Sequence, residues 1–328
     1  MTKFKSRAKD NFARRDHYQE ITDKIIAALE AGTRPWQKPW DPNVAGGSAM
    51  PVNAATGHRY RGINVLMLGM SALAFASQDP RWCTYRQAAE RDWQVRRGEK
   101  GAVVFFCKQI QIEDGETTDV CDDRAKRIPV MRSFTVFHAS QIEGIPPFTP
   151  LKADHTPWAR AEAADIILRN SKAIIRIGGD RAFYSPSTDH IQLPPDSAFH
   201  SAEGQAATAL HELAHWCGAK HRLNRDLTGR FGSAGYSREE LRAELASYFV
   251  GNTLGLPTDV PNHASYLASW ISVLKSDKRE IVRAAADAQK IADYLLAFHP
   301  DYAALADDPD DGIEAEQTDG ATSVAIAA

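Results

Sequence analysis

The amino-acid sequence predicts an α+β protein built from two domains. Its 328 residues are enough for two domains that each bury a hydrophobic core. The front part mixes helical periodicity with apolar strand-like runs, and the back part places three short strand-like runs before a long helical remainder. Prolines gather between the two parts. The expected organisation is a flexible basic arm at 1–15, a front domain at 16–145, a linker at 146–157, a back domain at 158–299 and a disordered tail at 300–328.

The first predicted helix covers residues 16–31. Ile21, Ile25 and Leu29 recur on one helical face there, and Gly32 follows its end. Apolar runs bounded by turn residues predict the remaining elements of the front domain. These are a helix after Tyr60–Asn64 to about residue 77, a short helix after Thr84, and strands at 102–107 and 133–138.

The back domain is predicted to begin with a helix at 158–170. Three short strands and four helices are expected to follow. The strands are at 173–177, 182–184 and 190–193, and the helices are at 208–217, 238–254, 263–276 and 278–298. The back domain is thus expected to consist of a small sheet that leads into helices.

The composition is that of an ordinary globular protein, with 43% hydrophobic and 25% charged residues. The sequence has no apolar run of about 18 residues and no signal-peptide core, so neither a membrane span nor secretion is expected. Four scattered cysteines show neither disulfide-scaffold density nor CxxC spacing. A cytoplasmic location fits these features best.

Residues 211–215 form the motif His-Glu-Leu-Ala-His within the predicted helix at 208–217. Two histidines four residues apart share one helical face, so His211 and His215 can bind one divalent metal. Glu212 then occupies the position of the general base in an HExxH peptidase. The alternative is a pair of helix-surface histidines without a metal, but such a motif arises by chance only about 0.02 times per chain of this composition. With a small sheet before it, the motif indicates a zincin-like domain.

A catalytic zinc site takes three protein ligands, so one more is needed downstream. His221 is a candidate because Gly218 and His221 complete the pattern HExxHxxGxxH. That pattern also demands a methionine turn, and all five methionines precede the motif. Glu244 is the rival candidate, since a carboxylate near the apolar stripe of the next helix is costly unless bound. We expect Glu240 to form a capping box with Ser237, and we therefore favour Glu244 as the third ligand.

The expected cofactor is one divalent metal, Zn²⁺ with Mn²⁺ as the alternative, held by the two histidines and Glu244. Glu212 would take a proton from the water that attacks a peptide carbonyl. Tyr184 and Tyr236 are candidates to stabilise the oxyanion, with ordinary packing as the alternative. The strand at 190–193 is a candidate to pair with an extended peptide substrate.

The net charge of −3 hides an asymmetry between the two halves. Residues 1–150 contain 22 Lys and Arg against 17 Asp and Glu, which is a net charge of +5, and the rest of the chain carries −8. A basic front half indicates that an anionic polymer binds there.

Aromatic and basic residues are interleaved in the front half, as in proteins that stack single-stranded bases beside cations. The opposing interpretation is that the tryptophans are core residues and the charges are solvated. The candidates for contact with single-stranded DNA are Trp36, Trp40, Tyr60, Arg61, Asn64, Trp82, Arg96, Arg97 and Lys100.

The chain resembles the ArdC-type antirestriction proteins of conjugative plasmids, which are related to the N-terminal part of plasmid TraC primases. The motifs that carry the resemblance lie between residues 14 and 298. They include Tyr60-Arg-Gly-Ile-Asn64, Arg96-Arg-Gly-Glu-Lys-Gly101, Tyr184-Ser-Pro-Ser-Thr188, His211-Glu-Leu-Ala-His215-Trp216 and Glu239-Glu-Leu-Arg-Ala-Glu244. The resemblance implies a domain that binds single-stranded DNA, a zincin-like domain and protection of incoming plasmid DNA from restriction. It also favours Glu244 over His221 as a ligand.

Two kinds of function remain open from the sequence. As an enzyme, the chain would cleave a peptide substrate, for which a host restriction protein is the candidate partner. As a binding module or primase accessory, it would shield or deliver single-stranded DNA, and its metal would be structural or regulatory.

Overall fold

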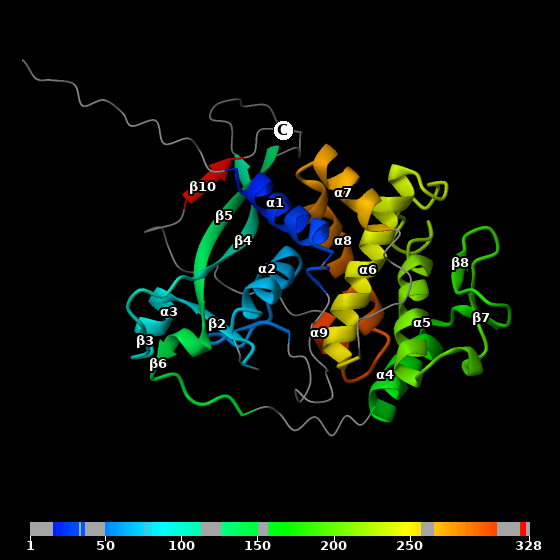
Figure 1. Ribbon diagram of the computed structural model, residues 1–328, viewed down its shortest axis with the longest axis horizontal. Coiled ribbons are helices and arrows are strands. Elements are labelled where there is room, and N and C mark those ends of the chain that lie inside the picture. The colour runs from blue at the N-terminus through cyan, green and yellow to red at the C-terminus, as the bar shows by residue number, and fades with distance from the viewer. Residues whose placement is uncertain are drawn as a thin grey trace, which may run out of the picture.

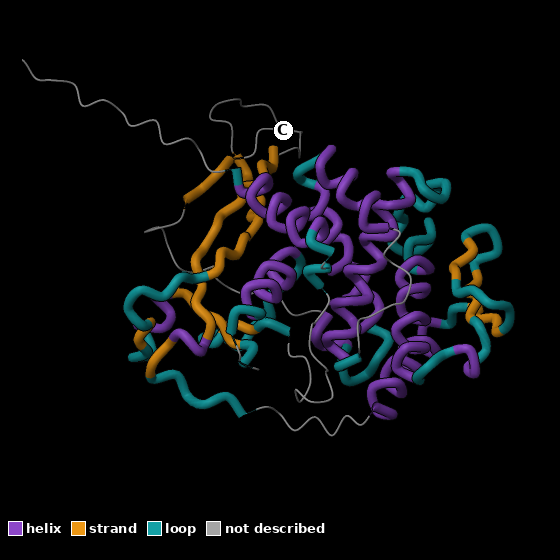
Figure 2. The backbone as a smooth tube through the Cα atoms, in the orientation of Figure 1, coloured by secondary structure: helices purple, strands orange, loops and turns teal. Residues whose placement is uncertain are grey.

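The computed structural model describes residues 16–32, 34–36, 50–75, 77, 79–112, 126–149, 157–256, 266–306 and 322–325. Figure 1 shows a sheet-rich front domain beside a helical back domain, whose small sheet lies at the opposite end of the molecule. The secondary structure is traced in Figure 2. The expected arm at 1–15, most of the expected linker and Trp40 lie outside the described residues.

The first helix, α1, covers His17–Glu30, as predicted. The Asp16 side chain accepts a hydrogen bond from the Gln19 N–H and caps the free donors of the first turn. The apolar stripe that contains Ile21 and Ile25 is fully buried.

The front sheet has the strand order β1-β2-β5-β10, and β4 pairs with β5. β4 and β5 form a long antiparallel ribbon in which Ala102 pairs with Val136 and Ile112 pairs with Lys126. Both strands extend beyond their predicted ends into polar sequence, because backbone pairing continues where apolar alternation stops. The strands are β1 (Val52–Asn53), β2 (Arg81–Thr84), β4 (Ala102–Ile112), β5 (Lys126–His138) and β10 (Thr322–Ala325).

Two short helices and a two-stranded sheet complete the front domain. Helix α3 begins with a capping box in which Thr84 and Gln87 satisfy each other's backbone N–H groups. The pair of strands β3 and β6 is antiparallel. These elements are α2 (Ile63–Ala72), α3 (Tyr85–Ala89), β3 (Gln94–Val95), the 3-10 turn η1 (Ala139–Gln141) and β6 (Ile142–Glu143).

The back domain begins with helix α4 (Pro157–Ser171) and a three-stranded sheet of order β7-β9-β8. β7 (Ile174–Ile177) pairs with β9 in parallel, and β8 (Phe183–Ser185) pairs with it antiparallel. β9 (His190–Leu193) therefore lies in the middle of this sheet. Its backbone is already paired on both sides, so an added peptide strand cannot pair with it as the sequence suggested.

The helices of the back domain follow in the predicted order after a short 3-10 turn, η2 (Asp196–Ala198). They are α5 (Ala202–Trp216), α6 (Ala234–Leu254), α7 (Leu267–Ser276), α8 (Glu280–Leu296) and α9 (Ala303–Ala306). The expected tail thus contains α9 and also β10, which pairs antiparallel with β5. No helix in the described part of the chain combines the length and apolarity that a bilayer span needs.

Helix α6 begins four residues earlier than the predicted capping box implies. Ser233 is the N-cap, and its side chain accepts a hydrogen bond from the Tyr236 N–H. Ser237 lies inside the helix and is buried. The predicted capping box of Ser237 with Glu240 is therefore wrong, which leaves the Glu240 carboxylate available for another role.

The largest hydrophobic cluster is common to both domains. A single buried cluster includes Ile25 of α1, Leu66 of α2, Leu213 of α5 and Leu241 of α6. Helix α1 packs on α7, and α2 packs on α8. The front domain also buries two clusters of its own, around Trp82 and around Cys83, as expected for a separate domain. The common cluster was not expected, because contacts this distant along the chain leave no periodic pattern in the sequence.

Candidate metal centre

Helix α5 presents the two histidines of the HExxH motif side by side. The Ser201 side chain caps the helix by accepting a hydrogen bond from the Gly204 N–H, and this sets where the first turn begins. Ten residues on, His211 and His215 project from one face, with 3.2 Å between their Nε2 atoms. Both Nε2 atoms therefore face the same point, as two ligands of one ion must.

The third member of the group is Glu240 of α6. Its Oε2 lies 3.7 Å from His211 Nε2, and its Oε1 lies 3.5 Å from His215 Nε2. The ligand atoms of these three residues all lie within 4.8 Å of one another. Two imidazole nitrogens and one carboxylate oxygen are the donor set of the His₂Glu zinc sites, so the side chains fit a divalent metal.

Glu244, the expected third ligand, lies behind His211. Its Oε2 is 4.0 Å from Nδ1, the ring nitrogen that faces away from Glu240. Its Oε1 accepts hydrogen bonds from Arg34 and Trp36. Glu240 and Glu244 are one helical turn apart, which is why their roles were exchangeable in the sequence. The geometry favours Glu240 as the ligand and Glu244 as its outer support.

A second outer carboxylate, which the sequence analysis missed, supports His215. Glu239 Oε1 lies 3.2 Å from His215 Nδ1. Arg225 holds this carboxylate with two bonds, from Nη2 to Oε1 at 2.7 Å and from Nε to Oε2 at 3.2 Å. Such outer carboxylates fix the orientation and tautomer of metal-binding imidazoles. The basic run Arg222-Leu-Asn-Arg225 after the motif was the signal in the sequence that could have pointed to this carboxylate.

His221, the alternative third ligand, lies away from the site. Its side chain is 64% exposed, and its Nε2 lies 3.5 Å from Asp189 and 2.6 Å from Arg222. The structure therefore does not bring it to the two motif histidines.

The carboxylates make the potential at the site negative. Burial lowers the pKa of His215, but Glu240 and Glu239 outweigh this effect and raise it to about 9. Glu240 and Glu212 likewise raise the pKa of His211 against the effect of burial. Burial raises the pKa of Glu240, yet the two imidazoles bring it down to about 2. A potential that holds protons on imidazoles also attracts a cation, which would displace those protons.

The group opens into a cleft of about 1000 Å³, which Glu212 and Tyr236 also line. The hydroxyl of Tyr236 lies 3.0 Å from that of Tyr266. Burial and hydrogen bonds with Tyr266 and Glu240 raise its pKa, so the phenol stays protonated and can donate. Tyr184 also lines the cleft, but its hydroxyl donates to Asp189 at 2.9 Å. Tyr236 is therefore better placed to act at the metal group than Tyr184.

Comparison with known proteins gives two matching family models and a solved structure of the same fold. Residues 162–287 match the family model of a zincin-like metallopeptidase, and residues 15–137 match that of the N-terminal domain of the anti-restriction factor ArdC. The metal-free crystal structure of the antirestriction ArdC protein from plasmid R388 is 40% identical, with a TM-score of 0.72. The match covers 87% of this chain and 98% of that one. The chain belongs to the ArdC antirestriction family.

The chain is also similar to a metal-bound ArdC structure and to two bacterial proteins. The Mn(II)-bound structure of the R388 ArdC protein matches with a TM-score of 0.70 and 40% identity over the same shares of the chains. A DNA primase TraC of Escherichia coli is 47% identical over 86% of this chain but only 27% of its own length, so the chain spans about a quarter of that primase. An uncharacterized protein of Sinorhizobium fredii is 42% identical, over 87% of this chain and 93% of that protein. The zincin-like domain and the Mn(II)-bound ArdC relative support a divalent metal at this site.

Within the ArdC N-terminal domain, three of the four aromatic residues predicted to stack on bases lie in the core, and the fourth, Trp40, lies outside the described residues. Trp36 is 1% exposed, Tyr60 is 0% exposed and Trp82 is 2% exposed. Asn64 is also buried, and its amide both donates to and accepts from the backbone of Phe105 at 2.8 Å. DNA cannot reach these side chains in this fold. Interleaved aromatic and basic residues do not by themselves distinguish a core from a surface.

The predicted basic residues are more accessible, with one exception. Arg61 forms an ion pair with Asp293 of α8, and this pair joins the two domains. Arg96 forms an ion pair with Glu99 and remains 44% exposed. Arg97 and Lys100 are exposed. The turn at 96–101 is therefore the part of the predicted DNA surface that solvent can reach.

Proposed function

We propose that this ArdC-family protein is a metal-dependent peptidase that also binds single-stranded DNA and protects incoming plasmid DNA during conjugation. The observation that carries the peptidase proposal is the convergence of His211, His215 and Glu240 in a cleft that also contains Glu212. The Mn(II)-bound ArdC relative adds support for the cofactor, either Mn²⁺ or Zn²⁺.

A divalent metal held by these three residues would supply Lewis acidity and lower the pKa of water near the site. Glu212 lines the same cleft as the three ligand candidates, and its carboxylate would take the proton from the attacking water. The protonated Tyr236 hydroxyl would donate to the developing oxyanion of a peptide carbonyl. Glu239 and Glu244 would keep the imidazoles oriented.

The edge strand β8 would bind an extended substrate. β8 pairs with β9 on one side only among the described strands, and Phe183 and Tyr184 of this strand line the cleft. A polypeptide that added to β8 as a further strand would pass the metal group with its backbone held by hydrogen bonds. A restriction protein of the recipient cell is the candidate substrate.

Glu212→Gln is the direct test of the catalytic proposal. The amide keeps the size of the side chain but cannot accept the proton, so hydrolysis of an unfolded protein substrate should fall by about 100-fold or more. The affinity for Zn²⁺ or Mn²⁺, measured by competition with a chelator, should change by less than about threefold, because Glu212 is not one of the proposed ligands. A variant that retains full protection of incoming DNA in conjugation would favour the alternative, a binding module with a structural metal.

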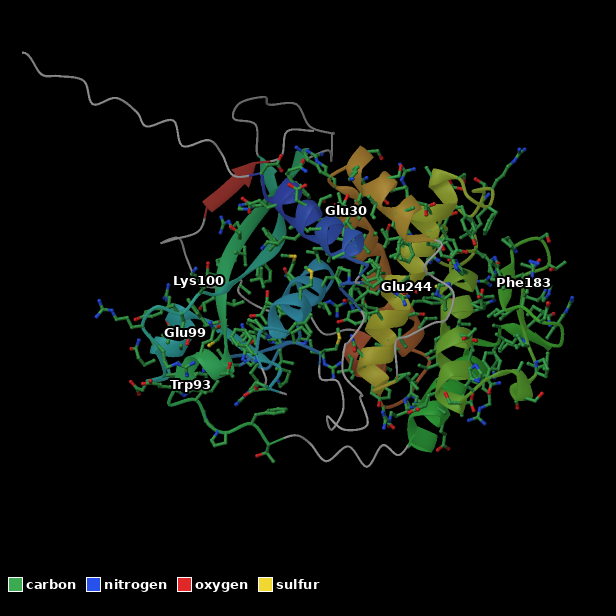
Figure 3. All side chains as sticks on the ribbon, viewed as in Figure 1. Glu30, Trp93, Glu99, Lys100, Phe183 and Glu244 are labelled. Carbon is green, nitrogen blue, oxygen red and sulfur yellow. The ribbon has the colours of Figure 1, made fainter. Side chains whose placement is uncertain are left out.

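The single-stranded DNA surface is proposed at one end of the front domain. Figure 3 shows Trp93, Glu99 and Lys100 together at this end, far from Glu244. Tyr85 is 55% exposed there, and the guanidinium of Arg91 lies 5.8 Å from the Trp93 ring centroid. Accessible rings beside cations can stack on bases and neutralise phosphates. Tyr85 and Trp93 thus take the stacking role first given to the buried rings.

The double variant Arg97→Ala, Lys100→Ala should bind single-stranded DNA more weakly. Loss of two phosphate contacts should reduce the slope of log affinity against log salt by about 1.4. Fluorescence anisotropy with a labelled oligonucleotide at several salt concentrations measures both quantities. The matched control removes two exposed lysines of the back domain, Lys275→Ala and Lys290→Ala. Equal salt slopes for the two double variants would reject this surface.

A further inference from the structure

Two residues of the front domain reach the outer layer of the metal centre. Arg34 Nη1 lies 3.2 Å from Glu244 Oε1, and Trp36 Nε1 donates to the same oxygen at 3.1 Å. Both residues precede Glu244 by more than 200 positions. They belong to the segment that matches the ArdC N-terminal domain, whereas Glu244 belongs to the segment that matches the zincin-like domain. The contact therefore crosses the boundary between the domains.

The hydrogen bonds to Glu244 are made in a buried environment. Glu244 is 2% exposed, Trp36 is 1% exposed and the Arg34 side chain is 13% exposed. A carboxylate removed from water needs charged or hydrogen-bonding partners to remain ionised, and bonds to charged groups are the stronger ones. Arg34 and Trp36 both donate to Oε1, so they help to hold this carboxylate in place.

The indole of Trp36 is itself held in position by Trp270 of α7. The two rings are in edge contact, with 5.7 Å between centroids and 62° between planes. Trp270 Nε1 donates to the backbone carbonyl of Ser237, which lies on α6 seven residues before Glu244. Packing thus fixes the Trp36 donor relative to the helix that carries Glu240 and Glu244.

Each motif histidine has a carboxylate near its outer nitrogen, within hydrogen-bond distance for His215 and at the longer distance of an ion pair for His211. His215 Nδ1 is supported by Glu239, which Arg225 of the back domain holds. His211 Nδ1 faces Glu244 at 4.0 Å, and Arg34 of the front domain holds that carboxylate. A carboxylate therefore lies near the outer nitrogen of each imidazole, and an arginine forms an ion pair with each carboxylate. Loss of such outer partners typically weakens metal affinity by about 10–100-fold.

We propose that Arg34 and Trp36 are positioning residues of the metal centre, so that the front domain completes the site carried by the zincin-like domain. This inference rests on the proposed function, because it presupposes that His211, His215 and Glu240 bind a metal. Neither residue touches the ligand atoms; both act through Glu244 on the orientation of His211.

Two substitutions in the full chain test this inference. Arg34→Ala removes the cation, and Trp36→Phe removes the indole N–H while keeping most of the ring packing. Each should weaken the affinity for Zn²⁺ and for Mn²⁺ by about 10-fold or more, measured by competition with a chelator of known affinity. Arg34→Lys should recover part of the loss, since it keeps the charge but not the planar geometry.

Arg61→Ala is the matched control, because it removes a different ion pair between the domains without touching the metal group. Its metal affinity should equal that of the unmodified protein. Urea unfolding of every variant without metal separates positioning from folding, since a purely structural role would lower stability and leave the affinity of the folded protein unchanged. If the unmodified protein binds metal and Arg34→Ala and Trp36→Phe bind it equally well, the inference is overturned and the proposed function stands. If the unmodified protein binds no stoichiometric metal, the proposed function itself fails.

Discussion

Glu240→Gln should reduce the affinity for a divalent metal by more than about 100-fold, whereas Glu244→Gln should reduce it by about 10–100-fold. The reason is that Glu240 offers its oxygens to both motif histidines, at 3.7 Å and 3.5 Å from their Nε2 atoms, and a neutral amide is a poor ligand. Glu244 faces only the outer nitrogen of His211. Calorimetric titration of the metal-free protein with Zn²⁺ and Mn²⁺ measures both affinities.

A carboxylate outside the site provides the control for this pair. Glu162 of α4 is exposed, and Glu162→Gln should bind metal as the unmodified protein does. The variant that binds metal more weakly, Glu240→Gln or Glu244→Gln, identifies the third ligand. If Glu244→Gln lost the metal and Glu240→Gln retained it, the original expectation from the sequence would be restored, and the assignment drawn from the geometry would be wrong.

Trp270→Ala should lower the free energy of unfolding by about 3–5 kcal/mol. Trp270 is fully buried, stacks on Tyr266 and contacts Trp36 in an edge arrangement. The substitution removes these ring contacts and the hydrogen bond to Ser237, and it leaves a cavity where the two domains meet. Urea unfolding followed by circular dichroism measures the loss.

The control for the core substitution is Leu73→Ala. Leu73 follows α2 and is 43% exposed, so its truncation should change stability by less than about 0.5 kcal/mol. A loss below about 1 kcal/mol in Trp270→Ala would mean that the region around this ring is loosely packed, and it would weaken the view that Trp270 fixes Trp36.

Most of the architecture could be predicted because it has a local cause. The apolar stripe of α1, the three strands of the back domain and the order of helices α5 to α8 follow from periodicity and turn residues in the sequence. The two histidines of the metal group could be predicted for the same reason, since their spacing on one helix places them together.

The third ligand depended on a detail that the sequence leaves ambiguous. Both Ser233 and Ser237 are plausible helix caps, and the choice between them decides whether Glu240 is a capping residue or a free carboxylate. The core positions of Trp36 and Tyr60 depended on long-range packing, which no local pattern records. The first failure is thus a local ambiguity of capping, whereas the second arises because burial is a property of the whole fold.

The common core of the two domains has a consequence for how this chain can be divided. A cut in the proline-rich segment between β6 and α4 would strip α1 from α7 and α2 from α8, and both pieces would expose apolar helix faces to water. Separate expression of either piece should therefore give a protein prone to aggregation. The same constraint agrees with the architecture of the much longer TraC primases, whose similarity to this chain extends over 86% of it. An alignment over that share of the chain is longer than either domain, so it includes parts of both.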